Sequence, residues 1–201
     1  PKDKAENPLL DQLGLKDRFV ISCAGNMGRA QAIETMFGAI SQIKNNADIH
    51  FVFVGSGAKR PWMEREIRTK KLHNVTLVDQ RPRSDQINFL NACDLAMASL
   101  IPGMAGAGVP SRMYNVMAAG KPLIAIAEEE SELSRVVREE QIGWVVEPDN
   151  PEKLADVILE AYMKKEVLHG MGKRARIVAE LKYSRDKIIQ DYRGLLQSLD
   201  C

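Results

Sequence analysis

The sequence has no excess of charge of either sign and no long hydrophobic run. Its 201 residues include 28 lysines and arginines against 27 aspartates and glutamates, so the formal net charge at pH 7 is +1. Nucleic-acid binders usually carry a marked basic excess, and nucleic acid is therefore not an expected partner. No stretch approaches the ~20 apolar residues of a membrane span, and no basic segment followed by an apolar one opens the chain.

Cysteine is scarce as well. Cys23, Cys93 and Cys201 are odd in number, far apart and without CxxC spacing. This spacing matches neither a zinc-binding motif nor a disulfide framework. It favours a reducing compartment, so we expect a cytoplasmic location. The chain starts at Pro1 in a polar run rather than at Met, which predicts a cut inside a longer protein. With 45% hydrophobic and 27% charged residues, the composition is that of a globular domain.

Apolar, β-branched runs alternate with amphipathic segments. Strands are predicted at residues 18–24, 49–54, 74–78, 94–99, 121–127 and 143–147. Helices are predicted between them at 30–44, 60–71, 84–92, 111–119 and 131–140, and after them at 151–163, 165–181 and 185–199. Runs that are apolar throughout are typical of parallel strands covered on both faces. The order predicts an α/β fold, a doubly wound, mostly parallel six-stranded Rossmann-like sheet with helices on both faces. Residues 18–201 form this domain, and residues 1–17 are a peripheral start or linker.

Three glycine clusters follow predicted strands, where open parallel sheets bind their ligands. They are residues 25–29, residues 55–57 and residues 103–112. Glycine lets the backbone approach a ligand, and a helix start offers free N–H groups to phosphate. In the third cluster we expect Ser111 to cap the next helix and Arg112 to grip phosphate oxygens. The alternative is that all three clusters are ordinary turns, and this alternative is weakest for the third cluster.

Several common site motifs are missing. The second cluster lacks the third glycine of GxGxxG, so a nicotinamide-binding fingerprint is not present. The sequence contains neither the Walker P-loop motif GxxxxGK[ST] nor GxSxG, the nucleophile motif of α/β-hydrolases.

Residues 110–122, PSRMYNVMAAGKP, resemble the donor-site helix of family 4 glycosyltransferases, the retaining enzymes of the GT-B fold. Shorter pieces in the family's order support the resemblance, which extends over residues 9–199: residues 23–28, 53–57, 91–94, 143–148 and 151–155. The resemblance implies the C-terminal, nucleotide-sugar-binding half of such an enzyme, using a UDP-sugar. It also implies an N-terminal domain that binds the acceptor, a glycan or lipid-linked molecule in polysaccharide biosynthesis. The activity implied is of hexosyl or N-acetylhexosaminyl type and absent without that domain, with no cofactor and no metal.

The resemblance also assigns residues to the parts of the donor. The diphosphate and sugar would contact Gly25, Asn26, Gly28, Arg29, Gly106, Ala107, Gly108, Val109, Pro110, Ser111 and Arg112. The ribose would contact Asn115, and the base would lie against Arg81 and Pro82. The sequence assigns no catalytic residue.

The chain departs from the family pattern at four positions. Many members carry a basic residue where this chain has Asn26 and Gln31, and a glutamate where it has Ala107 and Asn115. Arg29 and Arg112 are then the best candidates to supply positive charge. The departures support an alternative, a non-catalytic module of the same fold that binds a nucleotide or a partner. An epimerase of GT-B form is a weaker third hypothesis, because the donor loops lack the carboxylates and histidine it needs.

One basic stretch stands apart from the donor motifs. Residues 164–187 hold eight lysines and arginines against three acids. A solvated helix face is the default interpretation, and contact with an anionic membrane surface is the alternative.

Overall fold

Six parallel strands form one sheet in the order β3-β2-β1-β4-β5-β6 in the computed structural model, which describes residues 1–108 and 110–199. The strands are β1 (Phe19–Ala24), β2 (Ile49–Val54), β3 (Val75–Val78), β4 (Leu95–Ser99), β5 (Leu123–Ile126) and β6 (Gly143–Val146). Each pairing is parallel. The predicted doubly wound sheet is confirmed, and every predicted strand is present with its ends within two residues.

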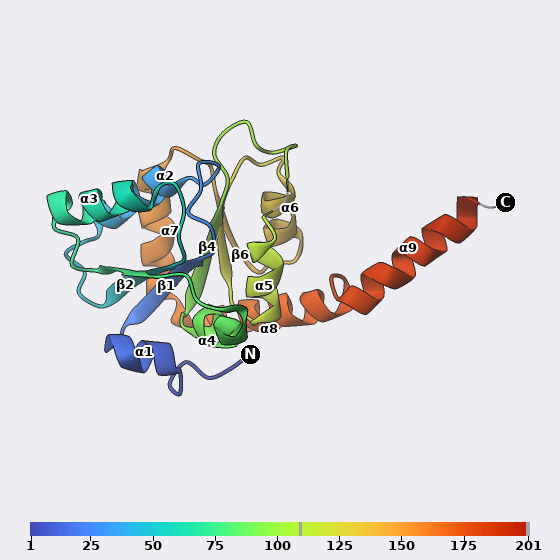
Figure 1. Cartoon of the computed structure of the whole chain (residues 1–201), viewed down its shortest axis with the longest axis horizontal. Coiled ribbons are helices and arrows are strands. Elements are labelled where there is room, and N and C mark those ends of the chain that lie inside the picture. Colours follow the sequence, from blue (N-terminus) through green and yellow to red (C-terminus); the bar gives the residue numbers. More distant parts are fainter. Residues whose placement is uncertain (109, 200–201) are drawn as a thin grey trace.

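Helices cover both faces of the sheet (Figure 1). Those on one face are α2 (Ile33–Gln42), α3 (Arg60–Lys70) and α7 (Pro151–Met163), and those on the other are α1 (Pro8–Leu13), α4 (Gln86–Asn91), α5 (Arg112–Ala118) and α6 (Glu132–Glu139). A 3-10 turn, η1 (Arg83–Asp85), precedes α4. The chain ends in α8 (Lys165–Leu181) and α9 (Arg185–Leu199).

Two hydrophobic cores, one on each face, explain why the strands are apolar throughout. In β1, Phe19, Ile21 and Cys23 belong to one core, while Val20 belongs to the other. Successive side chains of a strand point to opposite faces, so a strand covered on both sides needs apolar residues at every position. Each such side chain contributes about 1.5–3 kcal/mol when fully buried.

The segment predicted to be peripheral contains the short helix α1. Asn7 caps it through its side chain, which accepts hydrogen bonds from the N–H groups of Leu9 and Leu10. Both leucines are buried in the second core. The Asn7 amide also donates to the carbonyl of Asn88 at 2.8 Å, so residues 7–15 are packed on the domain rather than detached from it. The pair Asn7-Pro8 is a recognisable helix-start signal in the sequence, because asparagine is a favoured N-cap residue and proline is favoured at the first helical position.

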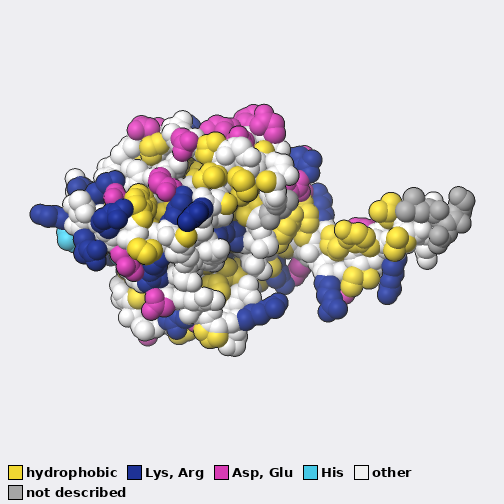
Figure 2. Space-filling model, turned by 45° about the horizontal axis from the view of Figure 1, so that its top comes forward, with side chains coloured by type: hydrophobic (Ala, Val, Ile, Leu, Met, Phe, Trp, Pro, Cys, Tyr) yellow, Lys and Arg dark blue, Asp and Glu magenta, His cyan; other side chains and the backbone are white. Residues whose placement is uncertain are grey.

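The last two helices differ in their surroundings. Helix α8 packs against α5, and a Cβ atom added to Gly172 would lie 2.3 Å from the carbonyl oxygen of Gly120. Helix α9 projects away from the body, and its apolar side chains are exposed (Figures 1 and 2). Within the described residues, no helix combines the length and apolarity that crossing a membrane requires.

Candidate functional site

A cavity of about 680 Å³ opens at the carboxyl ends of the central strands. It lies at the ends of β1 and β2, where Ala24, Gly25, Val54 and Gly55 line it, and extends to the start of α5. Here the strand order reverses between β1 and β4, because the chain runs outward from β1 in both directions. Open α/β sheets bind their ligands at such a switch point.

The side chain of Arg112 is fixed at this switch point by the loop after β1. Its Nη2 donates to the carbonyl oxygen of Asn26 at 2.8 Å, and its Nη1 lies 3.2 Å from Sγ of Cys23. Both acceptors are uncharged, and among the described residues no carboxylate forms an ion pair with Arg112. The guanidinium is therefore held in place with its charge uncompensated, an arrangement suited to an anionic ligand.

The buried thiol below it stays protonated. Burial raises the pKa of Cys23 above its ordinary value of 9.0, although the neighbouring Arg112 charge and hydrogen bond oppose that rise. A neutral thiol leaves the positive charge of Arg112 available to the cavity.

Two glycine loops pack back to back beneath the cavity. Gly25 has φ of +125° and Gly55 has φ of +138°, a region that side-chain-bearing residues rarely adopt. A Cβ atom at Gly55 would lie 2.1 Å from the carbonyl oxygen of Gly25. A Cβ atom at Gly25 would lie 3.3 Å from Nη2 of Arg112. Glycine is required at position 55 because the backbones of the two loops are in close contact. The absence of a side chain at Gly25 also leaves room for the Arg112 guanidinium against the loop after β1.

The described lining of the cavity contains no carboxylate. Its charged side chains are Arg112 and Arg81, and Arg81 is tied to Gln12 at 3.2 Å and to Asp85 at 3.5 Å. Its polar side chains are neutral amides and hydroxyls, at Asn26, Gln31, Ser56, Gln80, Gln86, Ser111 and Asn115. The cavity therefore has positive charge, many hydrogen-bonding groups, and no acid to repel phosphate.

The loop between β4 and α5 is held by a carboxylate from the next strand end. Glu128 follows β5 and accepts hydrogen bonds from the N–H groups of Gly103 at 3.0 Å and Ala105 at 3.3 Å. Gly106, Ala107 and Gly108 are exposed. They precede the lining residue Pro110 in the sequence but do not themselves line the cavity.

The structure brings half of the predicted residues together. The cavity is lined by Gly25, Asn26, Arg81, Pro110, Ser111, Arg112 and Asn115. Outside its lining lie Gly28, Arg29, Pro82, Gly106, Ala107 and Gly108. Val109 lies outside the described residues. Ligand contacts at all of these positions stay predictions.

One local expectation is wrong. Ser111 occupies the N-cap position of α5, but its side chain makes no capping hydrogen bond. Its backbone is already helical, with φ of −54° and ψ of −20°, whereas a capping serine needs an extended backbone for its oxygen to reach back. Helix α5 has only seven residues. Its dipole is a weak source of charge, so Arg112 is the main cationic group here.

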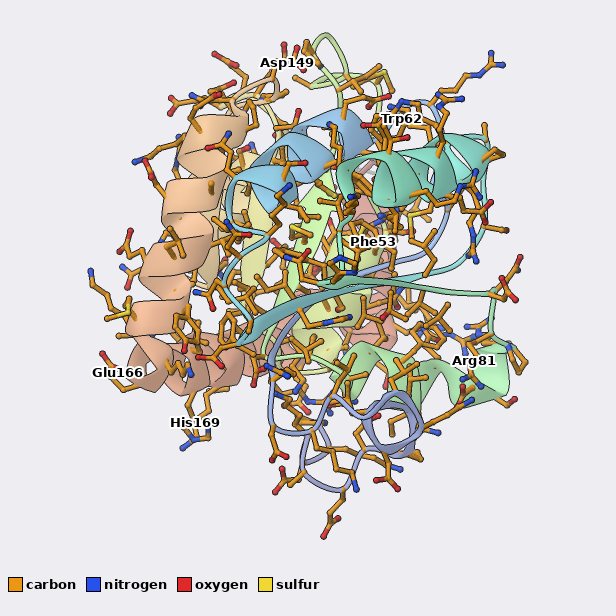
Figure 3. All side chains as sticks on the ribbon, turned by 90° about the vertical axis from the view of Figure 1, so that its left-hand side faces the viewer. Phe53, Trp62, Arg81, Asp149, Glu166 and His169 are labelled. Carbon is orange, nitrogen blue, oxygen red and sulfur yellow. The ribbon has the colours of Figure 1, made fainter. Side chains whose placement is uncertain are left out.

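Ser56, from the glycine cluster at residues 55–57, and Gln80, which follows β3, also line the cavity at the carboxyl ends of strands. Other cavity residues were missed from the sequence. Phe89 and Leu90 of α4 form an apolar wall, which no motif marks. Figure 3 shows Arg81 beside α4 at this side of the molecule. Within the described residues, no group of three or more His, Cys, Asp or Glu side chains is placed to hold a metal ion.

Comparison with known proteins gives one consistent result. Residues 18–164 match the family described as "Glycosyl transferases group 1". The chain is 31% identical over 199 residues to the probable glycosyltransferase WbjE of Pseudomonas aeruginosa, covering 99% of this chain and 49% of that protein. It is 25% identical over 192 residues to the "Putative colanic acid biosynthesis glycosyl transferase WcaI" of Escherichia coli (strain K12), covering 94% of this chain and 46% of that protein. It thus spans about half the length of these curated relatives.

A solved structure shares the fold. Anabaena Alr3699/HepE, crystallised in complex with UDP-glucose, superposes with a TM-score of 0.82 at 19% identity, over 98% of this chain and 53% of that one. The family match covers most of the domain, including both strand ends that form the cavity and Arg112. The resemblance inferred from the sequence is confirmed, and the chain belongs to the group 1 glycosyl transferases.

Proposed function

We propose that the cavity at the carboxyl edge binds a UDP-sugar, the donor of a retaining transfer of a hexosyl or N-acetylhexosaminyl group. The observation that carries the proposal is the fixed, uncompensated guanidinium of Arg112 in a cavity without acids. Cleavage of the sugar–phosphate bond leaves negative charge on the departing diphosphate. A preorganised cation beside that charge lowers the barrier, because it does not need to reorganise during the reaction.

The remaining polar groups suit the rest of such a ligand. Asn115 lies one helical turn beyond Arg112 on α5 and offers an amide to the ribose hydroxyls. Phe89 and Leu90 offer an apolar surface to the base, next to Gln80 and Arg81. Because arginine and backbone N–H groups can neutralise the diphosphate, the proposal needs neither metal nor cofactor.

The acceptor is assigned to a second domain outside these residues. The chain spans about half the length of its curated relatives, one of which is described as a colanic acid biosynthesis enzyme. We propose that the acceptor is a glycan or lipid-linked molecule of polysaccharide biosynthesis, that transfer takes place in the cytoplasm, and that this chain alone binds donor without completing transfer.

A non-catalytic nucleotide-binding module is the second candidate. The neutral side chains of Asn26, Gln31 and Asn115 support it, because each gives a weaker contact with phosphate or ribose than a charged group would. The two functions differ in whether the sugar adds binding energy to the nucleotide. A donor site binds a UDP-sugar differently from UDP, whereas a nucleotide sensor binds all compounds with the same base alike.

Calorimetric titration tests the proposal. The chain is titrated with UDP, GDP and a panel of UDP- and GDP-sugars, with and without EDTA. We expect one nucleotide series to bind, one sugar to be distinguished, and EDTA to have no effect. Equal affinity for all compounds of one series would favour the nucleotide-binding module, and dependence on a divalent cation would refute the metal-free diphosphate site.

A further inference from the structure

The connection between β4 and α5, residues 100–111, is rich in glycine and extends beyond the ends of the strands (Figure 1). It contains Gly103, Gly106 and Gly108, and among the described residues a Cβ atom added at any of the three would have no packing neighbour within 4 Å. A glycine-rich backbone has wide conformational freedom and loses much entropy when it is ordered. A ligand that contacts this loop therefore binds more tightly if the loop is already held in place.

The carboxylate of Glu128 holds the first half of this loop. Its two oxygens accept hydrogen bonds from the N–H groups of Gly103 at 3.0 Å and Ala105 at 3.3 Å. Among the described residues, these are the only hydrogen bonds that join residues 102–108 to another part of the chain. The side chain of Met104 adds an apolar contact with the second core. Because hydrogen bonds to an ionised acceptor are stronger than neutral ones, the carboxylate is the main polar restraint on the loop.

Glu128 is itself held in a rigid place. The preceding residue, Ala127, is fully buried, and its N–H group donates to the carbonyl oxygen of Val146 at 3.0 Å. The carbonyl oxygen of Glu128 accepts a hydrogen bond from the N–H group of Ser131 at 3.0 Å. Within the part of the chain that the structure describes, Glu128 forms no ion pair, so its carboxylate is committed to the loop.

The strand order places this loop next to the proposed diphosphate site. Gln80 and Arg81 follow β3, the loop after β1 holds Arg112, and the β4–α5 loop comes next, because the strands run in the order β3-β2-β1-β4-β5. In the proposed donor complex the base lies beside Gln80 and Arg81, and the diphosphate lies beside Arg112. The sugar is attached to the far end of the diphosphate. It therefore lies on the β4 side, toward residues 106–108.

We propose that Glu128 is a positioning residue for the sugar of the donor. By holding Gly103 and Ala105, it presents the N–H groups of Gly106 and Gly108 to the sugar and its phosphate; among the described residues these two groups donate no hydrogen bond. Glu128 does not line the cavity, so it acts through the loop. The inference rests on the proposed function, since it assigns this loop to the sugar of that donor.

The charge of Glu128 and its hold on the loop have opposite effects on binding. A carboxylate close to an anionic ligand repels it. Removing the charge alone should therefore strengthen binding, whereas loss of the two hydrogen bonds should weaken it. This difference in sign makes the positioning role testable.

Calorimetry on the full chain tests the proposal, with UDP, UDP-glucose and UDP-N-acetylglucosamine as ligands. Glu128→Gln keeps the size of the side chain but leaves one oxygen to accept two hydrogen bonds. We expect its affinity for the preferred UDP-sugar to fall about tenfold, the cost of ordering about one more backbone residue on binding. Its affinity for UDP should change less than twofold. Glu128→Asp keeps the charge but is one methylene shorter, and it should show the same selective loss.

Glu130→Gln is the matched control. It removes the same charge from an exposed position two residues along the chain, where the side chain makes no hydrogen bond within the described residues, and it should not weaken binding. Amide hydrogen exchange reports the loop directly, and exchange at Gly103 and Ala105 should be faster in Glu128→Gln than in the unmodified chain. Circular dichroism of each variant checks that the fold is retained.

The possible failures are distinguishable. An unmodified chain that binds no nucleotide would refute the proposed function and this inference together. An unmodified chain that does not distinguish either UDP-sugar from UDP would favour the nucleotide-binding module and overturn the inference. If the unmodified chain distinguishes a UDP-sugar, the inference alone is overturned by three results: Glu128→Gln binds that sugar as well as or better than the unmodified chain, it loses UDP to the same extent, or Glu130→Gln shows an equal loss.

Discussion

Arg112→Ala is the substitution that most sharply separates a diphosphate site from an ordinary glycine turn. In the free protein the Arg112 guanidinium makes two contacts, at 2.8 Å to the Asn26 carbonyl and at 3.2 Å to the Cys23 thiol. Both partners are neutral. Its other N–H groups are left for a ligand, since the side chain lines the cavity.

The size of the effect follows from the kind of contact. A hydrogen bond to a charged group contributes about 1.5–3 kcal/mol, so losing Arg112 should raise the Kd for UDP about 10- to 150-fold. Stability should fall by only about 1 kcal/mol, because the exposed Asn26 carbonyl regains a hydrogen bond from water and the buried Cys23 sulfur is a weak acceptor. Arg112→Lys should recover part of the affinity, since it restores the charge but not the planar fork.

Calorimetry with UDP measures the first effect, and urea denaturation measures the second. Arg83→Ala is the matched control: it removes the same charge from an exposed position nearby that does not line the cavity, and it should change the Kd less than twofold. An unchanged Kd in Arg112→Ala would refute the assignment of Arg112 to the diphosphate. Equal losses in the two variants would show that overall charge, rather than the fixed guanidinium, governs binding.

Three further outcomes are expected. Gly55→Ala should lower the free energy of unfolding in urea by about 2–4 kcal/mol, through strain at φ +138° and a clash with the Gly25 carbonyl; a loss below 1 kcal/mol would contradict that packing. Asn115→Ala should weaken UDP and UDP-sugars equally, by about 0.5–1.5 kcal/mol in calorimetry, and a loss confined to the sugar would place this side chain elsewhere on the donor. Burial raises the pKa of Cys23 and Cys93 above 9.0, so the unfolded thiols ionise first. Stability should therefore fall as pH rises above about 9, and Cys93→Ala should reduce that slope.

The sheet was predictable because its signals are local and strong. An apolar run marks each strand, and a glycine follows directly after β1 and β2. A strand that is buried on both faces also has little freedom to shift its register. Helix α1 was missed because six residues give too short a pattern to show periodicity, although Asn7 and Pro8 marked its start. The predicted helix over residues 84–92 proved to be η1 followed by α4, a distinction set by packing rather than by sequence.

The candidate site was predictable only in part. Glycine clusters after strands correctly located the cavity, since strand ends determine where a parallel sheet can bind. No sequence feature identifies which of Arg29 and Arg112 is the cation at the cavity. Arg112 lies against the β1 loop from a helix 87 positions after Gly25, a contact made by the fold alone. The apolar wall of α4 and the carboxylate of Glu128 that holds the β4–α5 loop are long-range features of the same kind.

Residue-resolved NMR can show whether UDP binds in the carboxyl-edge cavity, because it detects millimolar binding and reports where the ligand lies. The ¹⁵N-labelled chain is titrated with UDP, and amide shifts are followed along the sequence. We predict saturable shifts concentrated at Gly25, Asn26, Ser111, Arg112 and Asn115, and their loss in Arg112→Ala. An absence of shifts at millimolar UDP, or shifts concentrated away from the carboxyl ends of the strands, would contradict the assignment of the carboxyl-edge cavity as the donor site.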